Sequence, residues 1–240
     1  MNDVTGHFNN TNYNPYYTYP QWNDYYNTVY AQMNSCLCKK SFLRILNSYD
    51  TGLNVQINEI IMAEDLKQGD FTRYIKLEPG TYQVKIHESG EPKNLVFEST
   101  IDIERNLSYT GIIAEDDSDS SDIIVLMIPE AKEYAMSGKM SAVRFTNLAI
   151  EAPELELSTS DGTTLFSGIN YGDVSNNVAI PSGRYTLTLR EKTNKNSVKT
   201  INVDFAPRMH YTLFVAGKYS ENPEVKIIIP EDGVNYLELC

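Results

Sequence analysis

A chain of 240 residues with 41% hydrophobic and 22% charged residues has the composition of one large or two small globular domains. The net charge is −12 and the basic residues do not cluster, which argues against nucleic acid or an anionic membrane surface as a partner. No apolar run approaches the roughly 18–20 residues of a membrane-spanning helix, so we expect no membrane insertion.

Residues 1–40 differ in composition from the rest of the chain. They hold seven of the 17 tyrosines, eight asparagines and the only tryptophan, but almost no Leu, Ile or Val. Such a segment cannot build a core of its own. Two interpretations stay open: an unstructured tail, or an adhesive arm whose aromatic rings dock on a neighbouring subunit. The aromatic candidates for inter-subunit contact are Tyr16, Tyr17, Trp22, Tyr25 and Tyr26.

The N-terminus shows no visible signal peptide, because residues 1–7 have neither a basic patch nor an apolar stretch. We expect either a mature chain whose leader has been removed or a protein that leaves its cell by another route. Met1 favours the second route.

The first domain is expected at 41–130 and begins with the apolar run at 42–47. Leu53, Val55 and Ile57 alternate with polar residues, as in a strand with one buried face. Further strands are expected at 59–63, 71–77, 81–87, 95–103, 108–114 and 123–128. Gly, Pro, Asn and Asp cluster between these runs. Short strands at intervals of roughly ten residues predict an antiparallel β-sandwich of immunoglobulin-like type.

A linker at 131–141 follows, and it is too short to hold the two domains far apart. The second domain, 142–240 with a short C-terminal tail, repeats the first. The stretch 180–190 matches 77–87, so that Tyr185 and Leu187 take the places of Tyr82 and Val84. We expect all four of these side chains to be buried. Because many such anchors recur in the same order, the sequence predicts an internal duplication and an all-β protein of two tandem sandwiches.

The second repeat also resembles a known family. The residues that carry the resemblance are the runs 143–147, 152–153, 165–166, 171–174, 180–185 and 211–215, with 77–82 as the best match in the first repeat. They are similar to the bacterial domain-of-unknown-function 4397 family. The resemblance implies tandem β-sandwich modules of envelope and secreted proteins, without established catalytic residues.

No motif for catalysis is visible, and we expect neither an enzyme nor a cofactor. By strand alternation His87 and His210 fall on the solvent side. The recurring tyrosines Tyr82, Tyr109, Tyr185 and Tyr211 are expected to pack their rings inward and to bond their hydroxyl groups at sheet corners. Arg44 and Arg144 occupy matched strand positions and are each expected to pair with an acid of the same domain.

The run 115–122 is the one acidic cluster with ligands of the type that Ca²⁺ prefers. Its weak candidate metal ligands are Asp116, Asp117, Asp119 and Asp122. The EF-hand spacing fails, and the second repeat is not similarly acidic. A solvated hairpin loop is therefore the preferred interpretation over a cation site.

The three cysteines are too few for a disulfide framework, and they lie at the two ends of the chain. Cys36 and Cys38 precede the first domain and Cys240 is the last residue. This placement suits linkage between subunits, while free thiols remain the alternative.

These observations favour a non-catalytic structural or interaction protein of a bacterial surface layer. Its expected partners are copies of itself or other surface-layer proteins, and a spore coat or exosporium would suit the tyrosines, the terminal cysteines and the missing signal. A cytoplasmic location stays open. The alternative function is a ligand-binding module of the cell envelope, for carbohydrate or Ca²⁺.

Overall fold

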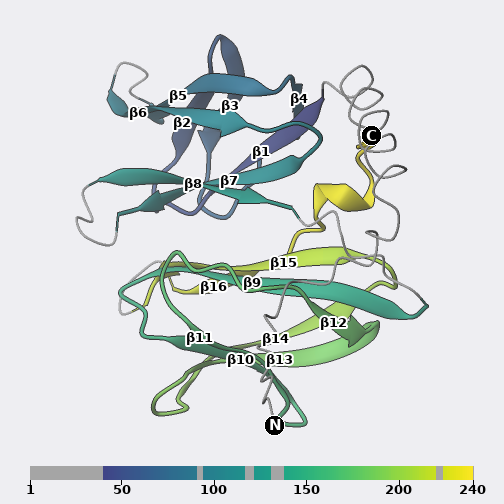
Figure 1. The fold of residues 1–240 in the computed structure, drawn as a ribbon. Coiled ribbons are helices and arrows are strands. Elements are labelled where there is room, and N and C mark those ends of the chain that lie inside the picture. The colour runs from purple at the N-terminus through teal and green to yellow at the C-terminus, as the bar shows by residue number, and fades with distance from the viewer. Residues whose placement is uncertain (1–39, 91–93, 117–121, 131–137, 220–223, 240) are drawn as a thin grey trace, which may run out of the picture. The chain divides into compact units, whose positions relative to one another are not determined.

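The structure is a computed structural model that describes residues 40–90, 94–116, 122–130, 138–219 and 224–239 (Figure 1). Nearly all of its regular structure is β-strand, and two similar sandwiches follow each other along the chain. The described part contains no α-helix, and therefore no helix that could cross a membrane. The predicted fold class is confirmed. The exact limits given above for the arm, the domains and the linker stay a prediction.

The strands of the first sandwich are β1 Ser41–Asn47, β2 Leu53–Ile57, β3 Ile60–Leu66, β4 Ile75–Leu77, β5 Gly80–Glu88, β6 Leu95–Ile103, β7 Ser108–Glu115 and β8 Ile123–Pro129. Those of the second are β9 Met140–Ile150, β10 Leu155–Thr159, β11 Thr164–Ile169, β12 Val178–Pro181, β13 Gly183–Glu191, β14 Ser197–Phe205, β15 His210–Lys218 and β16 Lys226–Ile228. A single 3₁₀ turn, η1 Gly233–Asn235, follows β16.

The two sandwiches have the same sheet topology. In the first, one sheet has the strand order β3-β2-β5-β6 and the other β4-β1-β7-β8. The corresponding orders in the second are β11-β10-β13-β14 and β12-β9-β15-β16, which repeat the first order strand for strand. The duplication predicted from sequence anchors is therefore present in the topology. One pair in each sandwich, β1 with β7 and β9 with β15, runs parallel, a feature that the antiparallel prediction did not contain.

Each sandwich encloses its own apolar core. In the first, β2 and β5 bring Leu53, Val55 and Val84 against Leu43 and Ile45 of β1. In the second, Leu187 and Leu189 of β13 are fully buried with Phe145 of β9. Strand alternation thus places the expected face of β5 and β13 inward.

A third apolar cluster joins the two sandwiches. Leu46, Ile112, Ala114 and Ile128 of the first sandwich are buried with Leu148 and Phe214 of the second. These residues lie on β1, β7 and β8 and on β9 and β15, so the sheet β4-β1-β7-β8 packs against the sheet β12-β9-β15-β16. The four sheets form a stack with these two sheets inside (Figure 1). Because an inner sheet is covered on both faces, β7 and β15 are buried along nearly their whole length.

The four recurring tyrosines make the expected hydroxyl bonds at the ends of strands. The hydroxyl groups of Tyr109 and Tyr211 accept hydrogen bonds from the backbone N–H groups five residues upstream, at 3.3 and 3.1 Å. Those of Tyr82 and Tyr185 donate to the carbonyl four residues upstream, at 2.8 and 2.6 Å. The expectation that Tyr82 and Tyr185 are buried is wrong: both are half-buried, because their hydroxyl groups reach the rim of the sandwich.

The core of the second sandwich yields a stability prediction. Leu187→Ala removes a fully buried side chain and leaves a cavity, so it should lower the free energy of unfolding by about 2–4 kcal/mol. Thr200→Ala, on the exposed face of the neighbouring strand, is the matched control and should change it by less than about 0.5 kcal/mol. Chemical denaturation of both variants makes the comparison, and equal effects would show that the register is misassigned.

Candidate functional site

The largest group of buried charges lies between the two inner sheets and is centred on two arginines. On β1, Arg44 is only 5% exposed. Its Nε donates to the hydroxyl of Thr110 at 2.9 Å and its Nη1 donates to the backbone carbonyl of Glu231 at 3.1 Å. Its Nη2 lies 3.3 Å from the carboxylate of Glu130 and 3.9 Å from that of Asp232. The guanidinium therefore contacts both sandwiches.

The second arginine repeats this pattern in the opposite direction. Arg144 on β9 donates from Nε to the hydroxyl of Thr212 at 2.7 Å and from Nη1 to the backbone carbonyl of Pro129 at 2.7 Å. Its Nη2 lies 3.8 Å from Asp232. Each arginine thus bonds a threonine of its own sandwich and a carbonyl of the other one. We call these two arginines, together with Glu130 and Asp232, the interdomain clamp.

Glu130 is the most fully satisfied acid of the clamp. It is 2% exposed and accepts hydrogen bonds from the hydroxyl groups of Ser108 and Thr110 at 2.7 and 3.0 Å. It also accepts the hydroxyl of Tyr74 and, at 2.6 Å, the backbone N–H of Gly233 from the second sandwich. A buried carboxylate is tolerated only where donors replace its lost hydration, and these groups do so.

Asp232 is the counterpart of Glu130 and is completely buried. It accepts the hydroxyl of Thr212 at 2.8 Å. Burial raises the pKa of Asp232, and the nearby guanidinium of Arg144 opposes that shift. Two guanidinium groups and two carboxylates balance in formal charge inside the clamp. Since all four side chains are at most 6% exposed, no ligand reaches them while the sheets stay packed. The clamp is a structural interface rather than an active site.

A second polar bridge joins the sandwiches at the other end of the inner strands. The Nζ of Lys218 lies 3.5 Å from Glu115 and 3.6 Å from Asp50. The hydroxyl of Tyr171 donates to the backbone carbonyl of Glu115 at 2.6 Å. Burial raises the pKa of Glu115, although Lys218 lowers it in part.

The sequence predicted that the two arginines pair with acids, but it did not predict their bonds across the interface. Arg44 and Arg144 each pair with an acid of their own domain, as expected. The bonds to the other sandwich were missed, and so were the roles of Glu130 and Asp232. The sequence did contain a pattern that could have pointed to the two acids, because each of them follows shortly after the apolar last strand of its repeat and a proline.

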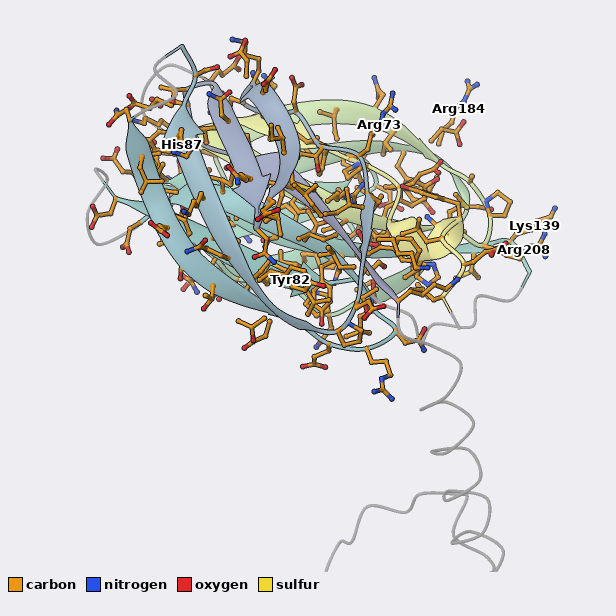
Figure 2. The ribbon with its side chains drawn as sticks, turned by 90° about the horizontal axis from the view of Figure 1, so that it is seen from above. Arg73, Tyr82, His87, Lys139, Arg184 and Arg208 are labelled. Carbon is orange, nitrogen blue, oxygen red and sulfur yellow. The ribbon has the colours of Figure 1, made fainter. Side chains whose placement is uncertain are left out.

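Both histidines were predicted on the solvent side of their strands, and the prediction holds for only one of them. His87 lies on the solvent side of β5 as expected (Figure 2). The solvent-side prediction for His210 is wrong: it is 9% exposed, with Nδ1 3.2 Å from the side-chain oxygen of Asn235. The cause is the second buried face of β15, which strand alternation alone does not reveal.

The other candidate residues are only partly covered by the structure. Asp117 and Asp119, the three cysteines Cys36, Cys38 and Cys240, and the arm residues Tyr16, Tyr17, Trp22, Tyr25 and Tyr26 lie outside the described residues. Asp116 and Asp122 are described, and the N–H of Asp116 donates to the carbonyl of Asp122 at 2.9 Å, which closes the base of the loop. Within the described ranges, no group of three or more His, Cys, Asp or Glu residues is placed to hold a metal ion.

The clamp predicts coupled stability effects. Arg44→Met and Glu130→Gln should each lower the free energy of unfolding by about 3–5 kcal/mol, because each leaves a buried charge without its partner. The double variant should lose about 1–3 kcal/mol less than the sum of the two. Denaturant titration measures the cycle, with Arg184→Met in an exposed ion pair as a control expected to have little effect. Strict additivity would contradict the clamp.

Glu115 predicts a pH dependence. Its pKa is raised in the folded state, so between the unfolded and folded pKa values the folded protein holds a proton that the unfolded chain has lost. The stability contributed by the protonated group is therefore present at low pH and is lost as pH rises through the folded pKa. Glu115→Gln should remove this loss, so that the wild type becomes less stable relative to the variant as pH rises from about 4 to 7. Thermal melts across this range test the sign; an opposite slope would show that Lys218 dominates.

Comparison with solved structures finds only distant similarities. The Bacillus anthracis TIE protein is 11% identical with a TM-score of 0.25, covering 75% of this chain but only 34% of its own. A carbohydrate-binding module from Eubacterium rectale Amy13K, solved with maltoheptaose, is 9% identical with a TM-score of 0.25 over 80% of this chain and 99% of its own. A family 41 carbohydrate-binding module from streptococcal virulence factors is 11% identical with a TM-score of 0.27, over 82% and 100%. At this distance no function is transferred.

No curated protein matches the sequence. A family model does, and it matches twice, as the duplication requires, over residues 41–158 and 158–235. The first match runs through the linker into β10 of the second sandwich. Together the two matches span most of the chain, which therefore belongs to the family described as domain of unknown function (DUF4397).

Proposed function

We propose that this chain is a non-catalytic structural and interaction protein of a bacterial surface layer, such as a spore coat or exosporium, and that it self-associates through residues 1–40. The observation that carries the proposal is the interdomain clamp. Its reciprocal bonds, with the apolar cluster around Leu46 and Phe214, tie two sandwiches into one body. A duplicated unit held in this way is a spacer of fixed geometry, which suits a building block better than a catalyst.

The outer sheet of the first sandwich offers a docking place. Its edge strand β3 carries Ile60 and Ile61, which are 44% and 65% exposed. Leu95 on the opposite edge strand, β6, is 44% exposed. Edge strands with exposed apolar side chains accept an added strand or an aromatic segment. We propose that the arm of a neighbouring subunit, with its tyrosines and Trp22, covers Ile60 and Ile61.

The cysteines at the chain ends complete the proposal. In an oxidising setting Cys36, Cys38 and Cys240 would form disulfides between subunits that the arm has brought together. Cys36 and Cys38 precede the first predicted domain and Cys240 ends the short C-terminal tail of the second, so such bonds are compatible with both folded sandwiches.

Self-association tests this function directly. Deleting residues 2–35 should leave the thermal unfolding of the sandwiches unchanged and shift the oligomer towards monomer in sedimentation velocity. Ile61→Lys should produce the same shift, because it places a charge in the docking place without touching the core. Thr200→Ala on the other sandwich is the control. Oxidised wild type should give multimers on non-reducing gels, and these should disappear when all three cysteines are replaced by serine. A full-length protein that stays monomeric at high concentration would overturn the proposal.

A further inference from the structure

A polar cleft of about 820 Å³ opens at one end of the outer sheet of the second sandwich. It lies where the β10–β11 turn, the start of β13 and the end of β14 meet. Its lining consists of Thr159, Ser160, Asp161, Arg184, Tyr185, Thr186, Asn202, Val203 and Asp204. None of these residues takes part in the clamp, so the cleft is independent of the structural interface.

The cleft arises from a difference between the two repeats. In the first sandwich the short β2–β3 turn folds back on β5: Asn58 donates its N–H to the carbonyl of Gln83 at 2.7 Å and accepts the N–H of Gln83 on its side chain at 2.8 Å. The corresponding turn of the second sandwich is longer and closes on itself, through a bond from the N–H of Thr159 to the carbonyl of Thr163 at 2.9 Å.

The longer turn leaves the start of β13 uncovered on one edge. The pairing of β13 with β10 begins at Leu187, whereas its pairing with β14 begins at Gly183. Residues 183–186 therefore have a neighbouring strand on the β14 side only. In the described chain, no bond between Ser160 and Thr186 replaces the one between Asn58 and Gln83.

Two side chains of the cleft, those of Asp161 and Asn202, are oriented by hydrogen bonds to neighbouring residues. Asp161 accepts the hydroxyl of Thr159 and, at 3.0 Å, the N–H of Thr163 on the same oxygen, Oδ1. These bonds hold the pKa of Asp161 below its usual value, so the group is a carboxylate. The side-chain oxygen of Asn202 accepts the hydroxyl of Thr186 at 2.8 Å, which directs its NH₂ group away from that bond.

The remaining lining adds a donor group. The side chain of Arg184 is 92% exposed, points away from the ribbon (Figure 2) and touches Asp204 only at 3.4 Å. Tyr185 and Val203 also border the cleft, but they alternate with these polar residues and pack towards the core, where the ring of Tyr185 lies 5.8 Å from that of Phe205. The cleft thus presents carboxylate acceptors and amide and guanidinium donors on a strand scaffold.

This mixture excludes several classes of ligand. Two carboxylates against one guanidinium give the lining a formal charge of −1, which disfavours anions such as phosphate. Asp161 and Asp204 are not part of any group of three metal-ligating side chains in the described chain. The many polar groups disfavour a purely apolar ligand, which would leave them without partners. A neutral ligand that both donates and accepts hydrogen bonds satisfies all of these constraints.

We propose that this cleft binds a neutral oligosaccharide. Each sugar hydroxyl is both donor and acceptor, so it can bridge an aspartate and the neighbouring amide or guanidinium. A cleft of this volume has the size of ordinary small-ligand sites. The proposal is separate from self-association, which uses the other sandwich.

The test is chemical-shift mapping on the full-length protein, with neutral hexasaccharides of α-1,4-glucose, β-1,4-glucose, β-1,4-mannose and β-1,4-N-acetylglucosamine as probes at about 10 mM, well above a millimolar Kd. At least one probe should shift the amide signals of residues 159–163, 184–186 and 202–204, and leave those of 81–83 and 100–102 in place. No shift with any probe, or shifts elsewhere, would overturn the proposal.

Variants then test the named side chains. Arg184→Ala, Asn202→Ala and Asp161→Asn should each weaken binding of that probe by about tenfold. Asp102→Asn, at the position of the first sandwich that matches Asp204, should leave it unchanged. Arg184 is so exposed that its removal leaves the fold intact, so unchanged binding in Arg184→Ala counts against the cleft. If Ca²⁺ alone, or an Asn/Tyr-rich peptide of residues 8–30, shifted the same amide signals, the ligand of the cleft would be that ion or peptide and not a sugar. The peptide result would also leave self-association standing, so the two proposals fail separately.

Discussion

The arrangement of the four sheets depends on two buried arginines that each bond the backbone of the other sandwich. A buried guanidinium is costly unless all of its donors are satisfied. Arg44 bonds the carbonyl of Glu231 and Arg144 bonds that of Pro129, so each makes this bond only when the two sandwiches meet in one orientation. The apolar cluster around Leu46 and Phe214 supplies non-directional attraction, whereas the arginines fix which orientation it takes. The clamp is thus the source of geometric specificity in an interface that hydrophobic burial alone would leave less defined.

Because the two sandwiches are repeats of one unit, the two arginines of the clamp make matching bonds. Some of their other contacts differ between the two repeats. Both arginines use a threonine of the neighbouring parallel strand and an acid beyond the last strand. Among the residues that the structure describes, aromatic rings flank the guanidinium on the first side only, with Phe71 and Tyr74 at 4.7 and 4.8 Å from the Arg44 carbon. Tyr74 also bonds Glu130, and Gly233 of the second sandwich donates to the same carboxylate. The C-terminal segment is therefore part of the interface and not a free tail.

Local pattern predicted the strands and the repeat, and it failed where a strand has two buried faces. Val84 and Leu187 follow the alternation because their sheets face solvent on the other side. His210 breaks it, since β15 packs on its own core with one face and on the first sandwich with the other. The sequence of one strand can show that residues on both of its faces are suited to burial. It does not show which sheet packs on the second face. For the same reason the sequence did not predict which groups across the interface bond Arg44, although it did show that Arg44 and Arg144 occupy matched positions. The arm and cysteine predictions remain predictions.

When one chain contains two copies of a fold, a segment whose structure differs between the copies is not determined by the fold itself. The turn between the second and third strands of each sandwich is such a place. In the first copy Asn58 seals the start of β5; in the second copy the longer turn around Asp161 leaves β13 open. Sealing the edge would give the backbone of Thr186 a partner within the chain, as Asn58 does for Gln83. An open edge lined by a fixed carboxylate and an oriented amide is the kind of departure from local optimum that accompanies a binding role. The clamp thus fixes how the two sandwiches meet, whereas the proposed recognition site lies at the outer end of the second sandwich.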